Sequence, residues 1–235
     1  MFTKSAAYYD AIYAALKDYR NEAHSVARLL RQARPDCRRV LDVACGTGEH
    51  ARYLDGAHGF DVDGIDLDPQ LLRIARGKHL RGSYWQADMV DFELGRRYDA
   101  VISLFSAIAY AGTLPRLRQA LACMQRHVAP GGVVLVEPFL GPEDIRQSKS
   151  DTLTVDVDGV RVTRTSRSEV IDRLFRLHLD YRFEGPASVE RASEVHDLGL
   201  FTVSEMLDSF GAAGLTASYH DDGPSGRGLY VASAA

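Results

Sequence analysis

The chain has 235 residues, of which 46% are hydrophobic and 26% are charged, an ordinary composition for a globular protein with its own core. Its formal net charge of -4 argues against a nucleic-acid partner, and no apolar run approaches the length of about 18 residues that a membrane span needs. Three widely spaced cysteines and no leader-like start predict a cytoplasmic protein with reduced thiols, without a disulfide framework or a metal site.

The first predicted element is one long helix over residues 8–34. Apolar residues recur at helical spacing from Ile12 to Leu30, with charged residues between them. Pro35 ends the pattern, since proline does not continue a helix.

Residues 39–137 alternate short apolar runs with helical stretches. The predicted strands cover 39–44, 62–66, 84–86, 99–104 and 133–137, and the predicted helices lie near 49–55, 69–77 and 115–128. Pro130-Gly131-Gly132 predicts a turn that leads from a helix into the next strand. Strands that alternate with helices indicate a parallel sheet with right-handed crossovers.

The pattern changes after Pro142. Residues 151–184 and 193–200 alternate apolar and polar residues, and Asp158-Gly159 marks a hairpin, so we expect three or four antiparallel strands. The last segment returns to the first style, with a helix through Ala213 that Thr202 and Glu205 cap, then strands over 215–220 and 229–233. The sequence therefore predicts an α/β, doubly wound, Rossmann-like sheet of seven strands, with an antiparallel β insertion.

The most informative motif is Val-Leu-Asp-Val-Ala-Cys-Gly-Thr-Gly at 40–48, a strand that runs into a glycine turn and then a helix. Glycine lets a ligand approach the backbone closely. Neither the third glycine of a dinucleotide site nor the Gly-Lys-Ser/Thr of a phosphate loop follows. The turn therefore favours a nucleoside ligand without phosphates.

This motif opens an ordered set that continues with Gly64-Ile65-Asp66, Ala87-Asp88-Met89, Tyr98-Asp99-Ala100 and Pro130-Gly131-Gly132. The set resembles the class I methyltransferases that depend on S-adenosylmethionine (SAM). With Tyr8-Tyr9-Asp10, Glu137-Pro138, Val195-His196 and 223–229, the chain resembles the N,N-dimethyltransferases of nucleotide-linked amino sugars, of the desosamine and mycaminose type.

The resemblance implies a last strand that is antiparallel and a division into three parts. Residues 1–38 would form a helical lid, 39–142 and 201–235 the SAM-binding core, and 143–200 a cap over the substrate. It also implies a homodimer, a small-molecule acceptor such as a nucleoside-diphosphate sugar, and S-adenosylhomocysteine as product.

Carried over residue by residue, the resemblance also places the cofactor. The glycine turn would hold the methionine tail, Asp66 the ribose hydroxyls, and Asp88 with Met89 the adenine. The expected cofactor-binding residues are Tyr19, Asp42, Ala44, Gly46, Gly48, Asp66, Leu67, Asp88, Met89 and Leu104.

For the acceptor, Tyr110 is predicted to orient the nucleophile or take its proton, with His196 as a second candidate and Tyr9 near the sulfonium. The expected substrate-binding residues are Tyr9, Ser106, Glu137 and Arg227, with Arg227 suited to grip a phosphate. Two alternatives stay open: O- or other N-methylation of a different natural product, and a SAM-binding protein without catalysis.

Overall fold

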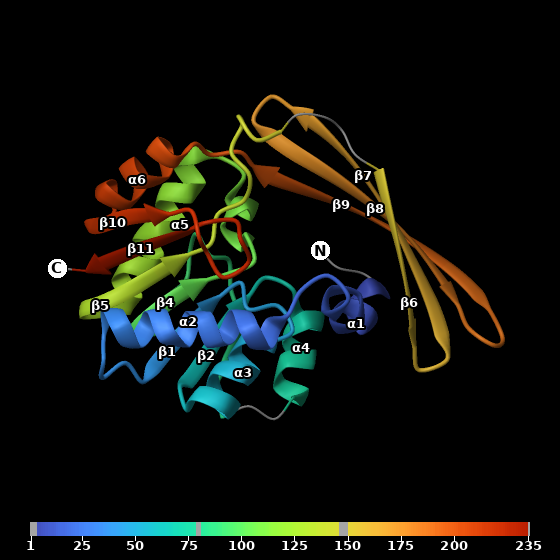
Figure 1. Cartoon of the computed structure of the whole chain (residues 1–235), viewed down its shortest axis with the longest axis horizontal. Coiled ribbons are helices and arrows are strands. Elements are labelled where there is room, and N and C mark those ends of the chain that lie inside the picture. Colours follow the sequence, from blue (N-terminus) through green and yellow to red (C-terminus); the bar gives the residue numbers. More distant parts are fainter. Residues whose placement is uncertain (1–3, 79–80, 146–149, 235) are drawn as a thin grey trace.

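The computed structural model describes residues 4–78, 81–145 and 150–234 (Figure 1). Residues 1–3 of the expected lid and 146–149 of the expected cap lie outside the described residues.

The core is a seven-stranded sheet with the order β10-β11-β5-β4-β1-β2-β3. Every strand pair is parallel except the two pairs that β11 makes with β5 and β10. The strands are β1 (Arg39–Val43), β2 (Asp61–Asp66), β3 (Tyr84–Gln86), β4 (Tyr98–Ser103), β5 (Val128–Val136), β10 (Leu215–His220) and β11 (Leu229–Ala234). The predicted fold class, with its antiparallel last strand, is confirmed.

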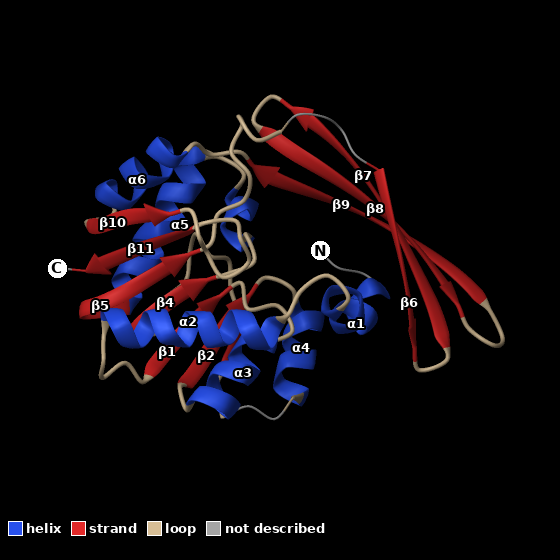
Figure 2. Ribbon diagram, viewed as in Figure 1, coloured by secondary structure: helices blue, strands red, loops and turns tan. Residues whose placement is uncertain are grey.

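Helices cover both faces of this sheet (Figure 2). One layer is α2 (Tyr19–Ala33), α3 (Glu49–His58) and α4 (Pro69–Gly77); the other is η2 (Ala107–Ala111), α5 (Leu114–His127) and α6 (Val203–Ala212). Alternate residues of β1 serve the two layers, because Val40 packs with α2 and α3 and Leu41 packs with α5 and α6. Among the described residues, no helix combines the length and apolar character that a membrane crossing requires.

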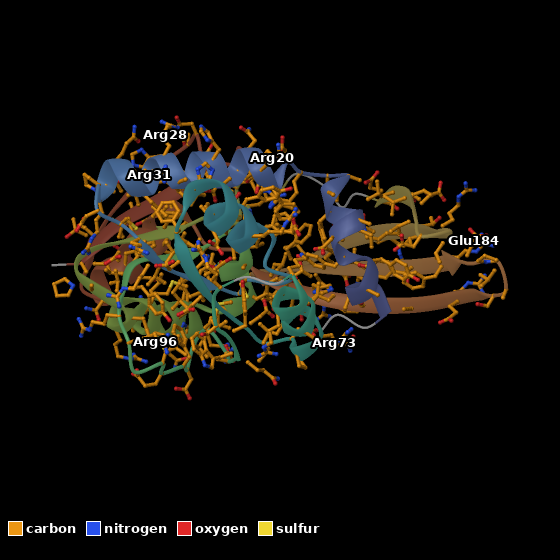
Figure 3. The ribbon with its side chains drawn as sticks, turned by 90° about the horizontal axis from the view of Figure 1, so that it is seen from below. Arg20, Arg28, Arg31, Arg73, Arg96 and Glu184 are labelled. Atoms are coloured by element: carbon orange, nitrogen blue, oxygen red, sulfur yellow. The ribbon has the colours of Figure 1, made fainter. Side chains whose placement is uncertain are left out.

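The insertion is a separate four-stranded antiparallel sheet, which we call the cap sheet. It runs in the order β6 (Ser150–Val157), β7 (Val160–Ile171), β8 (Leu174–Glu184) and β9 (Val189–Gly199). Asp158 and Gly159 form the predicted hairpin turn, and both have positive φ. The cap sheet extends well beyond the core, and Figure 3 shows Glu184 near its far end.

The start of the chain fills the space between the core and the cap sheet (Figure 1). It forms η1 (Lys4–Tyr8) and α1 (Tyr9–Ala14). Ile12 is buried against Val162, Leu179 and other apolar residues of the cap sheet. The cap sheet is therefore packed on the N-terminal segment as well as joined to the core by β9, which contacts η2.

The prediction of one helix over 8–34 is wrong, because the helix is interrupted between Ala14 and Tyr19. The backbone N–H groups of Leu16 and Lys17 both donate to Tyr13, which closes α1. Asp18 then caps α2, since its carboxylate accepts from the Asn21 N–H at 3.0 Å. The apolar spacing continues across the break, which is why periodicity alone missed it.

Pro130-Gly131-Gly132 is not a turn that precedes a strand, as predicted, but part of β5. The register of β5 against β4 shifts between the pairs Tyr98–Val128 and Ala100–Val133, so these residues form a bulge. Gly131 has a φ of 65° there, a conformation that glycine adopts at little cost.

Candidate active site

A cavity of about 800 Å³ lies between the core, the N-terminal segment and the cap sheet. It sits at the carboxyl ends of the core strands, next to the point where the chain order reverses across β1, which pairs with both β2 and β4. Open α/β sheets bind ligands at this position. Twelve of the residues expected to bind or act line the cavity, namely Tyr9, Ala44, Gly46, Asp66, Leu67, Asp88, Met89, Leu104, Ser106, Tyr110, His196 and Arg227.

The turn after β1 forms the floor at one end. Ala44, Gly46 and Gly48 all have positive φ. The Gly46 N–H donates to the Asp66 carboxylate at 2.8 Å, and a Cβ placed on Gly46 would point towards the Tyr9 hydroxyl, 4.0 Å away. The missing side chain thus leaves a space between the turn and Tyr9 in which a ligand can touch backbone.

Two acids line this end of the cavity. Asp66 also accepts from the Asp68 N–H at 2.9 Å, and burial raises the pKa of its carboxyl. Asp88 accepts from the Val90 N–H at 3.2 Å and pairs with the half-exposed Arg116 at 3.0 Å. Both carboxylates are held by the ends of their strands and keep lone pairs for a ligand's hydroxyl or amine groups.

Three residues predicted for the cofactor do not line the cavity. Gly48 begins α3 and packs against Ala75. Tyr19 is buried with its ring edge-on to His50. Asp42 is 2% exposed, and burial, reinforced by repulsion from Asp66, raises its pKa to about 7.

Glu137, predicted to bind substrate, also lies behind the wall. Its carboxylate accepts from the Phe105 N–H at 2.6 Å and from the Ser225 hydroxyl. Phe105 and Ser106 are consecutive non-glycine residues with positive φ, a conformation that costs on the order of 1–3 kcal/mol for each residue. In the structure Glu137 holds this strained loop, and the Ser106 hydroxyl adds a bond to the Pro138 carbonyl at 2.6 Å.

Beside this loop, at the break between α1 and α2, lies a cluster that was not among the predicted site residues. The buried Lys17 ammonium lies 2.7 Å from Glu22 and 3.7 Å from the centroid of the Phe105 ring, and Glu22 also bonds His50 at 2.8 Å. Burial lowers the pKa of both Lys17 and His50. Lys17 and Glu22 line the cavity, so this cluster ties the N-terminal segment to its wall.

The two predicted acceptor-side groups meet. The Tyr110 hydroxyl lies 3.0 Å from Nδ1 of His196, although one is on η2 and the other on β9. Burial raises the pKa of Tyr110 well above its usual range, so the phenol stays neutral. Burial raises the pKa of Tyr9 in the same way. The cavity therefore has neutral hydroxyl groups on two sides.

Arginines line the cap-side end of the cavity. Arg227 bonds the Ser106 hydroxyl at 3.3 Å and lies over the Phe105 ring. Arg164, on β7, was not predicted; it is 8% exposed and lies over the Tyr13 ring, and its Nε has no hydrogen-bond partner among the described residues. Within the described residues, neither guanidinium forms an ion pair with a carboxylate.

Several other arginines do not line the cavity. Figure 3 shows Arg20, Arg28 and Arg31 along α2, at the outer edge of the core, and these side chains are exposed. The alternation of buried and exposed residues along 160–166 puts Arg164 on the same face of β7 as Val162. The cavity is thus acidic at the glycine turn and basic beneath the cap sheet. In the part of the chain that the structure covers, no three histidine, cysteine or acidic side chains group as metal ligands would.

Comparisons with known proteins agree with this geometry. A methyltransferase domain family matches residues 40–132. The dTDP-3-amino-3,4,6-trideoxy-alpha-D-glucopyranose N,N-dimethyltransferase of Streptomyces venezuelae is 39% identical over 95% of this chain and 94% of its own length. The crystal structure of Streptomyces venezuelae DesVI superposes with a TM-score of 0.92 at 37% identity, covering 100% of both chains. The structure of SAM-bound CalS10, an amino pentose methyltransferase from Micromonospora echinaspora, superposes with a TM-score of 0.86 at 36% identity, covering 100% of this chain and 98% of that one.

Proposed function

Because the chain belongs to the family of SAM-dependent N-methyltransferases that act on nucleotide-linked amino sugars, we propose that it transfers two methyl groups to the amine of a nucleoside-diphosphate deoxysugar. The observation that carries this proposal is the single cavity that joins the glycine turn to Tyr110 and to two arginines, which have no carboxylate partner among the residues that the structure describes. One end fits a nucleoside with a cationic tail, and the other fits an anionic acceptor.

The residues at the acidic end fit SAM. The space above Gly46 admits a chain against the backbone, and the two oxygens of Asp66 suit vicinal ribose hydroxyls. Leu67, Met89 and Leu104 supply apolar surface for the adenine and the tail, with Asp88 as acceptor for the adenine amine. Bound there, the cofactor supplies a methyl group on a positively charged sulfur.

Residues behind the cavity wall support this end. We propose that the Asp42 carboxylate attracts the cofactor's ammonium from behind the glycine turn. Tyr19 and Gly48 then hold the turn against α3 by packing. Glu137 acts on the acceptor side through the loop of Phe105 and Ser106 rather than by direct contact.

At the basic end, Arg227 and Arg164 would bind the diphosphate, since guanidinium groups match phosphate oxygens in geometry and charge. A buried guanidinium without an anion, such as that of Arg164, costs free energy. An anionic acceptor would supply the missing counter-charge and so stabilise the complex. Ser106 adds a hydroxyl near Arg227. This charge arrangement favours a phosphorylated acceptor over a neutral natural product.

The chemistry needs alignment more than strong acids or bases. The protein must hold the amine, the methyl carbon and the sulfur in line and keep water out, and such positioning supplies about 7–11 kcal/mol of barrier lowering. Tyr9 and Tyr110 offer oxygens that accept hydrogen bonds from the amine and so point its lone pair at the methyl group.

The same proposal includes the parts of the chain, the cellular location and the oligomeric state. We assign residues 1–38 to a lid, 39–142 and 201–235 to the core, and 143–200 to the cap. Unpaired Cys37, Cys45 and Cys123 support a cytoplasmic location. The exposed apolar side chains of Val189 and Val195 on β9 support a homodimer, which light scattering of the purified protein would test.

The deciding experiment is methylation of a dTDP-amino-deoxysugar by the purified protein with SAM, followed by mass spectrometry. Products with one and then two added methyl groups would support the proposal. Methylation of a matched hydroxy sugar alone would indicate an O-methyltransferase. SAM binding without turnover of any acceptor would indicate a binding protein.

A further inference from the structure

Behind Tyr110 and His196 stand two more polar groups, both away from the cavity wall. Nε2 of His196 lies 3.4 Å from one carboxylate oxygen of Glu194, and the Ser5 hydroxyl donates to the other oxygen at 2.5 Å. Glu194 is 5% exposed and His196 is 4% exposed. Four side chains from η2, β9 and η1 thus form a continuous hydrogen-bonded row.

The donors and acceptors in this row have one consistent direction. Ser5 donates to one oxygen of Glu194, and an ionised carboxylate carries no proton to donate, so its other oxygen is also an acceptor. Nε2 of His196 must then carry the proton that faces Glu194, which leaves Nδ1 as an acceptor. The Tyr110 hydroxyl donates to Nδ1, and its oxygen lone pairs remain for a group in the cavity.

Alignment of the reacting atoms does not explain how the nitrogen loses a proton between the two methyl transfers. The direction of this row of hydrogen bonds provides a route for that proton. After the first transfer the nitrogen–carbon bond has formed, the sulfur–carbon bond has broken with its electron pair on sulfur, and the nitrogen is a secondary ammonium. An ammonium has no lone pair, so the second transfer requires that it first lose a proton.

Resting on the proposed N,N-dimethylation, we propose that Tyr110 and His196 take this proton and that Glu194 is the positioning residue that sets their direction. The ammonium gives its proton to the Tyr110 oxygen as the phenol proton moves to Nδ1 of His196. His196 becomes an imidazolium beside the Glu194 carboxylate, and the nitrogen regains its lone pair. The imidazolium returns the proton to water after the product leaves.

Two substitutions test the two halves of the relay. Glu194→Gln keeps an acceptor of the same shape but removes the charge that balances the imidazolium. His196→Gln keeps an acceptor for Tyr110 but cannot take a proton. The cap sheet provides a matched control, Glu169→Gln, since Glu169 bonds His178 at 3.1 Å as an exposed pair on the opposite face.

The readout is the rate of each methyl transfer at saturating SAM, with mono- and dimethylated products separated by mass spectrometry. In Glu194→Gln and His196→Gln we expect the second transfer to slow by about 100-fold, at the low end for a lost acid–base group, so that monomethyl product accumulates. The second transfer should slow much more than the first, S-adenosylhomocysteine affinity should stay near the wild-type value, and Glu169→Gln should match the wild type throughout. Equal slowing of both transfers, or none, would overturn the relay.

A second measurement needs no acceptor. Nitrogen-15 NMR of the histidine rings should show His196 protonated at Nε2 and not at Nδ1 in the free protein. The opposite tautomer would overturn the direction assigned to Glu194, even if either variant failed to fold. A wild-type enzyme that methylates no amino sugar would instead overturn the proposed function, and the relay with it.

Discussion

The Tyr110 hydroxyl and Nδ1 of His196 lie 3.0 Å apart and come from opposite sides of the cavity, 86 positions apart in the chain. One belongs to the core and the other to the cap sheet. The cap sheet is therefore part of the cavity, since it supplies the hydrogen-bond partner of the Tyr110 hydroxyl.

Replacing Tyr110 by Phe should lower kcat by about 10- to 100-fold, because the ring stays in place while the oxygen that meets the amine is lost. SAM affinity should not change, since the cofactor-binding residues are untouched. Steady-state kinetics and calorimetry check both. Tyr53→Phe, which removes an exposed hydroxyl on α3, is the control, and a fully active Tyr110→Phe enzyme would remove this residue from the mechanism.

Replacing Asp66 by Ala should weaken SAM binding by about 100-fold, the effect of losing charge-assisted hydrogen bonds worth roughly 2–3 kcal/mol. The substitution also frees the Gly46 N–H, so the glycine turn loses one of its supports. Calorimetry measures the affinity. Asp61→Ala, at the other end of β2, removes only an exposed ion pair with Arg38 and should bind SAM as the wild type does.

Replacing Arg227 by Ala, or Arg164 by Met, should raise KM for a nucleotide-linked acceptor by about 10- to 100-fold while kcat changes little. The diphosphate is the same in the ground state and in the transition state. The substitution therefore weakens binding of both equally, which raises KM and leaves kcat unchanged. Neither substitution should affect methylation of the free amino sugar. Arg161→Ala, on the outer face of β7, is the control; if it raised KM as strongly, a general loss of positive charge would explain the effect.

Asp42 predicts a pH dependence of cofactor binding. Its pKa of about 7 in the free protein comes first from burial and then from Asp66. The cofactor's ammonium would favour the ionised carboxylate and lower this pKa, so binding should release a proton and strengthen as pH rises towards 7. Calorimetry in buffers of different ionisation enthalpy measures the released proton. Asp42→Asn should release none, and proton uptake by the wild type would contradict the assignment.

Local sequence patterns predicted the features that are determined by residues close together in the chain. The strand–turn–helix at 39–58 and the acid at the end of β2 follow from apolar periodicity and glycine placement, and the capping box follows from the spacing of Thr202 and Glu205. Parallel strands then bring their carboxyl ends together, which is why so many of the expected cofactor residues share one cavity.

What could not be predicted depends on how distant segments meet. The importance of Arg164 and Glu194 lies in their burial against the N-terminal segment, which no local spacing encodes. Glu137 could be placed at a strand end, but not opposite the N–H of Phe105, because the positive φ of that residue has no signature in its side chain. The helix break before Tyr19 could not be predicted, because Asp18 resembles any other polar position in an amphipathic pattern.

The walls of the cavity include Tyr9 near one end of the sequence and Arg227 near the other. The chamber is complete only when the N-terminal segment and the loop between β10 and β11 have both packed on the core, since each supplies part of its wall. During refolding from denaturant, binding of the acceptor should therefore be among the latest signals to return.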